Sequence, residues 1–289
     1  MTSFAAVEVY PDRSEQGMSH PLKPIPPLTE PIRILVAVAH HDDIEFGVGG
    51  SVARWVQEGA SVTYVIITDG GAGSNDPNIT RAELVERRRH EQMAAAAAVG
   101  VQDVRFLGYP DGLLTPSLEL RRDLTRIVRE LKPHRVILQD PTTVYVENNY
   151  INHPDHRAAG EAMTYAVFPS AETRLIFPEL LAEGYEPHHV SEVFLTLSLH
   201  NTHYVDITTT MERKLSALRA HISQIGEGEA AEKGALGWIR EYCAEAGARV
   251  GVEYAELYRV MDFSRPPSEK SARRQRETQT HPAAEEQPR

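Results

Sequence analysis

The fold of this chain is decided by Arg33-Ile34-Leu35-Val36-Ala37-Val38-Ala39-His40-His41-Asp42-Asp43. The first seven residues are an apolar, partly β-branched run without alternating polar positions. Such a run is typical of a strand buried on both faces of a parallel sheet. The four polar residues follow that strand directly. Ligands of open α/β sheets bind beyond the carboxyl ends of the strands, so the stretch predicts both a sheet and the place of a site.

Strand-like and helix-like segments alternate from here onward. We expect further strands at 62–68, 104–107, 136–138, 193–199 and 254–262, and helices at 47–57, 80–98, 117–130, 154–167, 211–221 and 231–246. Repeated strand-helix units with apolar strands predict a Rossmann-like α/β fold, a mostly parallel sheet with helices on both faces. The later elements are expected to pack on the same domain. Residues 47–50 (Gly-Val-Gly-Gly) lack the spacing of a dinucleotide-binding loop and favour close helix packing instead.

Composition limits the classes of partner. The 289 residues carry a formal net charge of −11 and show no dense basic stripe in the body of the chain, which disfavours nucleic acid and anionic membranes. Cys243 is the single cysteine, so an intramolecular disulfide is excluded and a small core residue is expected. A cytoplasmic protein is expected. A homo-oligomer is left open.

We expect three parts along the chain. Residues 1–31 are polar and proline-containing and predict an N-terminal arm, residues 32–263 predict the catalytic domain, and residues 264–289 predict a disordered polar tail.

A second polar cluster, His153-Pro154-Asp155-His156, opens a predicted helix. Imidazoles and a carboxylate from the two clusters suit a catalytic metal site with three protein ligands and an open position for water: His40, Asp43 and His156. Asp42 is then placed to act as general base. His153, oriented by Asp155, is placed to stabilise the oxyanion or protonate the leaving amine. A purely structural alternative stays open, because aspartate caps helices and proline opens them.

Ala39-His40-His41-Asp42-Asp43-Ile44-Glu45, together with Asn152-His153-Pro154-Asp155-His156-Arg157, resembles the PIG-L/LmbE-like zinc-dependent N-acetylglucosaminyl deacetylases. The resemblance implies removal of an N-acetyl group from a small amino-sugar conjugate, releasing acetate and a free amine. It implies the same roles for the residues just named, with Zn²⁺ as the metal, although other divalent ions also fit these ligands. Arg88 matches an arginine that helps hold the sugar in some members. An exposed helical arginine is the equal alternative.

The chain departs from the family pattern at two places. His41 replaces the usual proline, which removes a fixed φ and adds a competing ligand. Glu45 lies one place later than the usual acidic residue, and its role is left open. Tyr145 and Tyr150 flank the second cluster and are candidates for stacking on a sugar ring. Two other functions are kept open: an amidase acting on a larger acyl group, and a metal- or sugar-binding protein without catalysis.

Overall fold

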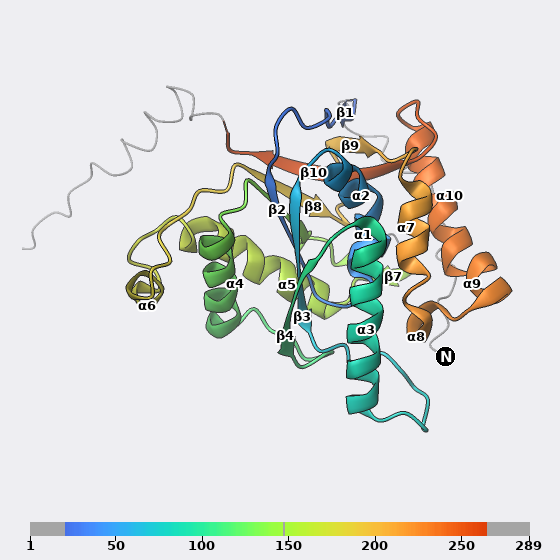
Figure 1. Ribbon diagram of the computed structural model, residues 1–289, viewed down its shortest axis with the longest axis horizontal. Helices are drawn as coiled ribbons and strands as arrows, with labels where there is room; N and C mark the ends of the chain where they lie inside the picture. The colour runs from blue at the N-terminus through green and yellow to red at the C-terminus, as the bar shows by residue number, and fades with distance from the viewer. Residues whose placement is uncertain (1–20, 147, 265–289) are drawn as a thin grey trace, which may run out of the picture.

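The computed structural model describes residues 21–146 and 148–264. It has the expected architecture, a mostly parallel sheet with helices on both faces (Figure 1). The strand order is β1-β9-β10-β8-β5-β2-β3-β4. Five neighbouring strands run parallel: β8 (Glu192–Thr196), β5 (Arg135–Gln139), β2 (Arg33–Val38), β3 (Ser61–Thr68) and β4 (Asp103–Tyr109).

The remaining strands extend the sheet beyond β8. β10 (Ala255–Asp262) is antiparallel to β8 and to β9 (His203–Asp206), and β1 (Lys23–Pro24) pairs in parallel with β9. β1 lies within the predicted arm, and the predicted boundaries at 31 and 263 stay predictions. Residues 265–289 of the predicted tail lie outside the described residues. A separate hairpin joins β6 (Tyr145–Val146) and β7 (Tyr150–Ile151).

β2 is buried on both faces, which explains its unbroken apolar sequence. Alternate side chains point to opposite faces of a strand, so Ile34, Val36 and Val38 enter one core cluster. Leu35 and Ala37 enter the other cluster with Ala39, which follows the strand. The first core includes side chains of α2 (Gly49–Gln57), α3 (Arg81–Val99), α7 (Met211–Leu218) and α10 (Ala235–Ala248), and the second includes those of α4 (Leu118–Leu131) and α5 (Pro154–Tyr165).

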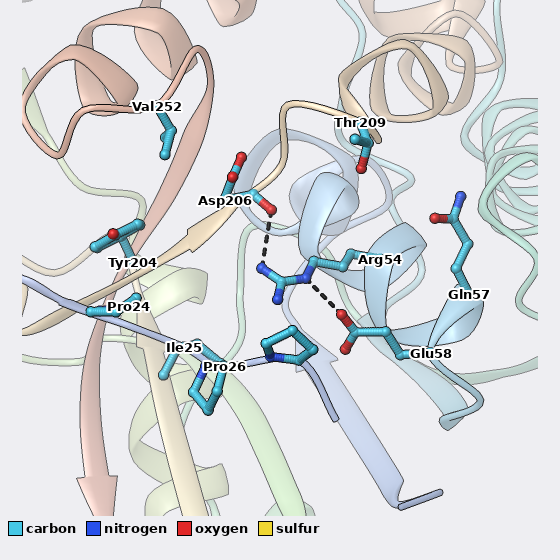
Figure 2. A pocket seen from close by; sticks show the side chains of 11 residues that line it. Pro24, Ile25, Pro26, Arg54, Gln57, Glu58, Tyr204, Asp206, Thr209 and Val252 are labelled. Atoms are coloured by element: carbon cyan, nitrogen blue, oxygen red, sulfur yellow. Dashed lines mark hydrogen bonds and ion pairs between the residues drawn. The ribbon is translucent and has the colours of Figure 1, made fainter. Parts of the chain in front are cut away.

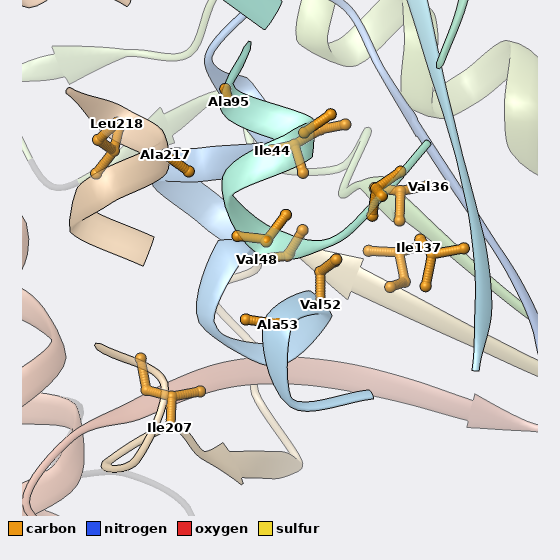
Figure 3. Close-up of a cluster of buried hydrophobic side chains, with 14 of the residues drawn as sticks. Val36, Ile44, Val48, Val52, Ala53, Ala95, Ile137, Ile207, Ala217 and Leu218 are labelled. Atoms are coloured by element: carbon orange, nitrogen blue, oxygen red, sulfur yellow. The ribbon is translucent and has the colours of Figure 1, made fainter. Parts of the chain in front are cut away.

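The expected helix at 47–57 corresponds to α2, and a short helix that was not expected, α1 (Asp43–Gly47), precedes it. Val48 between them is not helical, with φ −140° and ψ 6°. Ile44, Val48 and Val52 point from these two helices into the first core (Figure 3). Gly50 lies so close to Ile207 that an added Cβ would be 2.7 Å from its Cδ1, which supports the expected packing role of the glycines.

A buried ion pair holds the junction of α1 and α2. Lys214 Nζ donates to Phe46 O in α1 at 2.7 Å and to Glu256 Oε1 at 2.6 Å. Glu256 also accepts from the N–H groups of Gly50 and Ser51 at the start of α2. The carboxylate therefore satisfies donors that a helix start leaves free.

Short elements complete the described chain. They are a π-helical turn at Ala166–Ser170, α6 (Pro178–Ala182), α8 (Ile222–Ile225) and α9 (Gly228–Lys233). Among the described residues, no helix has the length and apolar character needed to cross a membrane.

Candidate metal and catalytic site

The first polar cluster lies at the point where the strand order reverses. The chain leaves β2 toward β3 on one side, while β5 pairs with β2 on the other. Two hydrogen bonds fix Ala39 at the end of β2: its N–H donates to Gln139 Oε1 at 3.1 Å, and its carbonyl accepts from Thr68 N at 2.9 Å. The turn that carries His40 is therefore anchored to both neighbouring strands, where α/β sheets form their ligand crevice.

His40, Asp43 and His156 come together as a candidate metal site. One ligand atom from each lies within 4.8 Å of the others. Asp43 is central, because its Oδ2 is 3.5 Å from His40 Nδ1 and its Oδ1 is 3.1 Å from His156 Nε2. Asp43 Oδ2 also accepts from His40 N at 2.7 Å, which holds the carboxylate inside the turn.

The outward-facing nitrogens of both histidines have acceptors. His40 Nε2 lies 3.2 Å from Asp111 Oδ1 and 3.3 Å from Asp155 Oδ2. His156 Nδ1 lies 3.0 Å from Asn152 Oδ1. An acceptor on one ring nitrogen places the proton there and frees the other nitrogen for a metal. The arrangement thus selects His40 Nδ1 and His156 Nε2 as the ligand atoms.

The charges around this point also fit a cation. Burial lowers the pKa of His40, but hydrogen bonds with Asp111, Asp155 and Asp43 outweigh burial and raise the pKa well above its ordinary value. Burial raises the pKa of Asp43, and the opposite effect of His156 and His40 brings it well below its usual range. The three carboxylates around His40 concentrate negative charge, which a divalent metal bound beside Asp43 would offset.

A second group, His40, His153 and Asp155, also meets the distance criterion for a metal site. Its carboxylate, however, already accepts from two backbone groups, Gly112 N at 2.7 Å and Leu114 N at 3.1 Å. We therefore favour the group with Asp43, whose carboxylate faces both histidines.

Asp155 does not orient His153 in the expected way. His153 Nδ1 accepts from the backbone N–H of Asp155 at 3.2 Å, while the Asp155 carboxylate contacts His40. Because Nδ1 is an acceptor, neutral His153 carries its proton on Nε2. Its ring stands at 90° to that of His40 with centroids 4.7 Å apart, so this donor lies beside the candidate ligands.

Asp42 lies next to the metal group in a left-handed conformation, with φ 83° and ψ −26°. Arg88 Nη2 approaches its Oδ2 at 3.4 Å. Burial raises the pKa of Asp42 to about 6, against the lowering effect of Arg88. A carboxylate with a pKa near neutrality is a stronger base than an ordinary aspartate.

Arg88 is buried at 3% exposure, so the alternative of an exposed helical arginine is wrong. Its guanidinium donates to His41 O at 2.7 Å and to Gly70 O at 3.1 Å. These bonds join the turn after β2 to the loop after β3. Direct contact of Arg88 with a sugar stays a prediction.

His41 turns away from the candidate ligands and belongs to neither candidate metal group of the described residues. Its ring stacks on Phe106 with centroids 5.5 Å apart, and it is buried. Burial, followed by the charge of Arg88, lowers its pKa to about 3, so the ring stays neutral. The competing-ligand interpretation of His41 is not supported.

Asp111 is a site residue that sequence reasoning missed. It follows β4 and contacts His40 through Oδ1, while its Oδ2 accepts from Ala72 N at 2.9 Å. The segment Tyr109-Pro110-Asp111-Gly112 has the composition of an ordinary turn. Its position after a strand of the parallel sheet is the signal that could have pointed to the site.

Two cavities lie away from this chemistry. One of about 530 Å³ is formed between the segment containing β1 and α2, and Figure 2 shows Arg54 reaching across it toward Asp206 and Glu58. The other, of about 320 Å³, is lined by residues 56, 60–63 and 100–103. Neither lining includes a candidate site residue.

Comparison with known proteins agrees with this geometry. The model of the PIG-L family, described as GlcNAc-PI de-N-acetylase, matches residues 35–167, which include both polar clusters. Diacetylchitobiose deacetylase of Thermococcus kodakarensis is 32% identical over 205 residues, covering 70% of this chain and 73% of the relative. A probable N-acetyl-alpha-D-glucosaminyl L-malate deacetylase 2 of Bacillus anthracis is 33% identical over 197 residues, covering 66% and 80%.

A solved structure shows the same likeness. N,N'-diacetylchitobiose deacetylase from Pyrococcus horikoshii superposes with a TM-score of 0.74 at 32% identity, covering 80% of this chain and 84% of that chain. A match over 80% of the chain extends well beyond the two polar clusters. The chain belongs to the PIG-L family.

Proposed function

We propose that this protein removes the N-acetyl group from an N-acetylglucosamine-type substrate, releasing acetate and a free amine. Its relatives at 32 and 33% identity are named as deacetylases of such amino sugars. The observation that carries the proposal is the arrangement of Asp42 beside the group formed by His40, Asp43 and His156. A base next to a three-ligand metal group is one arrangement that can hydrolyse an unactivated amide.

We propose zinc as the metal. Two imidazoles and one carboxylate leave an open fourth position, which is the ligand set of catalytic rather than structural zinc. Bound there, the metal would supply a Lewis acid that acidifies water and polarises the amide carbonyl. The acceptors Asp155 and Asn152 hold the two histidine rings in the orientation that ligation needs.

Asp42 and His153 then have separate tasks in the reaction. Asp42 takes a proton from the attacking water as the new C–O bond forms. His153 donates a hydrogen bond through Nε2–H to the developing oxyanion and keeps its proton. Asp42 passes the proton that it took from water to the amine nitrogen as the C–N bond breaks, and the acetic acid that leaves loses its own proton to solvent.

The hairpin β6–β7 supports a sugar-binding surface near the site. Tyr150 is 38% exposed, and burial together with the negative charge of Asp43 raises its pKa. Tyr145 is 65% exposed on the same hairpin. We propose that these rings contact the sugar.

The proposal is tested by acetate release from N,N'-diacetylchitobiose with zinc-loaded protein. Asp42→Asn keeps the size of the side chain but removes the base, so kcat should fall by about 10²- to 10⁴-fold while bound zinc stays stoichiometric. Asp103→Asn, a control at the opposite end of the sheet, should retain kcat. Unchanged kcat in Asp42→Asn would exclude this base, and faster release of a larger acyl group would contradict the acetyl preference.

A further inference from the structure

A buried hydrogen-bonded network begins at the backbone N–H of Asp42. It joins Gln92 of α3, Glu45 of α1 and His221, the residue before α8. Each of the three residues has 0% exposed surface. Gln92 Nε2 donates to Glu45 Oε1 at 3.0 Å, and His221 Nε2 lies 3.0 Å from Glu45 Oε2.

The chemistry of these groups fixes the polarity of the network. Gln92 donates its amide N–H to a carboxylate oxygen of Glu45, so its amide nitrogen faces Glu45. The amide oxygen of Gln92 must then face the opposite way. That oxygen accepts the backbone N–H of Asp42 at 3.2 Å. His221 Nε2 contacts the second carboxylate oxygen of Glu45, so both oxygens of Glu45 have a partner.

Asp42 needs such an external constraint. It is one of four described non-glycine residues with positive φ, a conformation that L-residues disfavour. Its carbonyl accepts from Phe46 N as the first bond of α1, and its side chain is approached by Arg88. The hydrogen bond from Asp42 N–H to Gln92 Oε1 is therefore the one that holds the backbone amide of Asp42, and with it the direction of the Asp42 side chain.

We propose that Gln92, Glu45 and His221 are positioning residues that keep Asp42 in its left-handed conformation and so aim its carboxylate at the reacting water. This inference rests on the proposed function for its catalytic meaning. Its structural content, the dependence of the Asp42 backbone on Gln92, stands independently of the substrate. None of the three residues belongs to either candidate metal group of the described chain.

Steady-state kinetics of acetate release test the proposal. Gln92→Leu and Glu45→Leu should lower kcat by about 10- to 100-fold, because small misplacement of a base is costly. KM should change by less than about twofold and bound zinc should stay stoichiometric, since substrate contacts and ligands are untouched. Gln57→Leu, the same substitution at an exposed position of α2, is the matched control and should behave as wild type.

A conservative variant separates geometry from folding. Glu45→Gln can still accept from Gln92 through its oxygen and donate to His221, whose Nδ1 has no hydrogen-bond partner in the described chain and can take up the proton. It should recover kcat to within about threefold of wild type. A kcat as low as that of Glu45→Leu would overturn the proposal.

Two further measurements decide whether the network acts through Asp42. In an Asp42→Ala background, Gln92→Leu should cause no additional loss of the residual rate, whereas independent, multiplicative losses would overturn the proposal. A crystal structure of Gln92→Leu should show Asp42 outside the left-handed region. An unmoved Asp42 overturns the proposal even if the wild-type protein proves inactive toward acetylated sugars, so this readout separates it from the proposed function.

Discussion

Asp42 combines an unfavourable backbone conformation with the proposed role of general base. A left-handed conformation costs an L-residue about 1 to 3 kcal/mol, although aspartate tolerates it better than most. The hydrogen bond that Asp42 N–H donates to Gln92 and the one that its carbonyl accepts from Phe46 N–H offset that cost in the folded protein. The same turn places the neighbouring Asp43 toward the histidines, so two adjacent carboxylates acquire different tasks.

Cys243 illustrates a single-residue property that can be measured directly. It is fully buried in α10, as expected, and burial raises the pKa of its thiol to about 11. At pH 8 the native thiol should react with Ellman's reagent more than about 100-fold slower than the urea-unfolded protein, since the thiolate is the reactive form. Reactivity should rise as the pH approaches 11. Equal rates in native and unfolded protein at pH 8 would show that α10 opens readily.

At the scale of single residues, the sequence predicted a site residue where both its chemical type and its place at the end of a predicted element pointed to the site. His40, Asp43 and His156 were predicted as a group, and the structure brings them together, although their roles stay proposals. Asp111 was missed because a lone aspartate in a Pro-Asp-Gly turn has no chemical neighbour in the sequence. Only the assembled sheet places it against His40.

At the scale of elements, substitutions of two adjacent glycines at the start of α2 test how closely this helix packs on its neighbours. Gly50→Ala would bring Cβ within 2.7 Å of Ile207 Cδ1 and should lower the free energy of unfolding by about 1 to 3 kcal/mol. Gly49→Ala makes only ordinary contacts, at 3.5 Å from Lys214, and should range from neutral to about 1 kcal/mol more stable. Urea denaturation measures both. Similar effects in the two variants would mean that Ile207 yields to the added methyl group.

The long elements were predictable because their signals are local. α3, for instance, begins with a capping box between Thr80 and Glu83 and ends at left-handed Gly100. β1 and β9 were missed because strands of two and four residues are defined by their partners rather than by a periodic pattern. α1 was missed for a related reason, since the distant residues Lys214 and Glu256 hold its junction with α2.

At the scale of the whole molecule, the candidate ligands link two distant parts of the chain. His40 and Asp43 lie after β2, while His156 lies in α5 on the other face of the sheet. Zinc at about 100-fold excess over its Kd should therefore raise Tm by roughly 5 to 10 °C, because it binds the native arrangement. Differential scanning calorimetry with zinc and with a chelator measures this difference.

His156→Ala removes one ligand and should abolish most of the zinc-dependent rise in Tm. His90→Ala, at an exposed position of α3, provides the matched control and should keep the full rise. A rise that survives in His156→Ala would place the metal elsewhere.

The contact of Glu256 with Gly50, 206 positions apart, has a consequence for biosynthesis. At about 5 to 20 residues per second, a ribosome adds Glu256 roughly 10 to 40 s after Gly50. Before Glu256 is added, the nascent chain already contains both polar clusters, while the start of α2 still lacks the Glu256 carboxylate. The motif-bearing turn is thus translated early, and the support behind it is completed only when the last strand emerges.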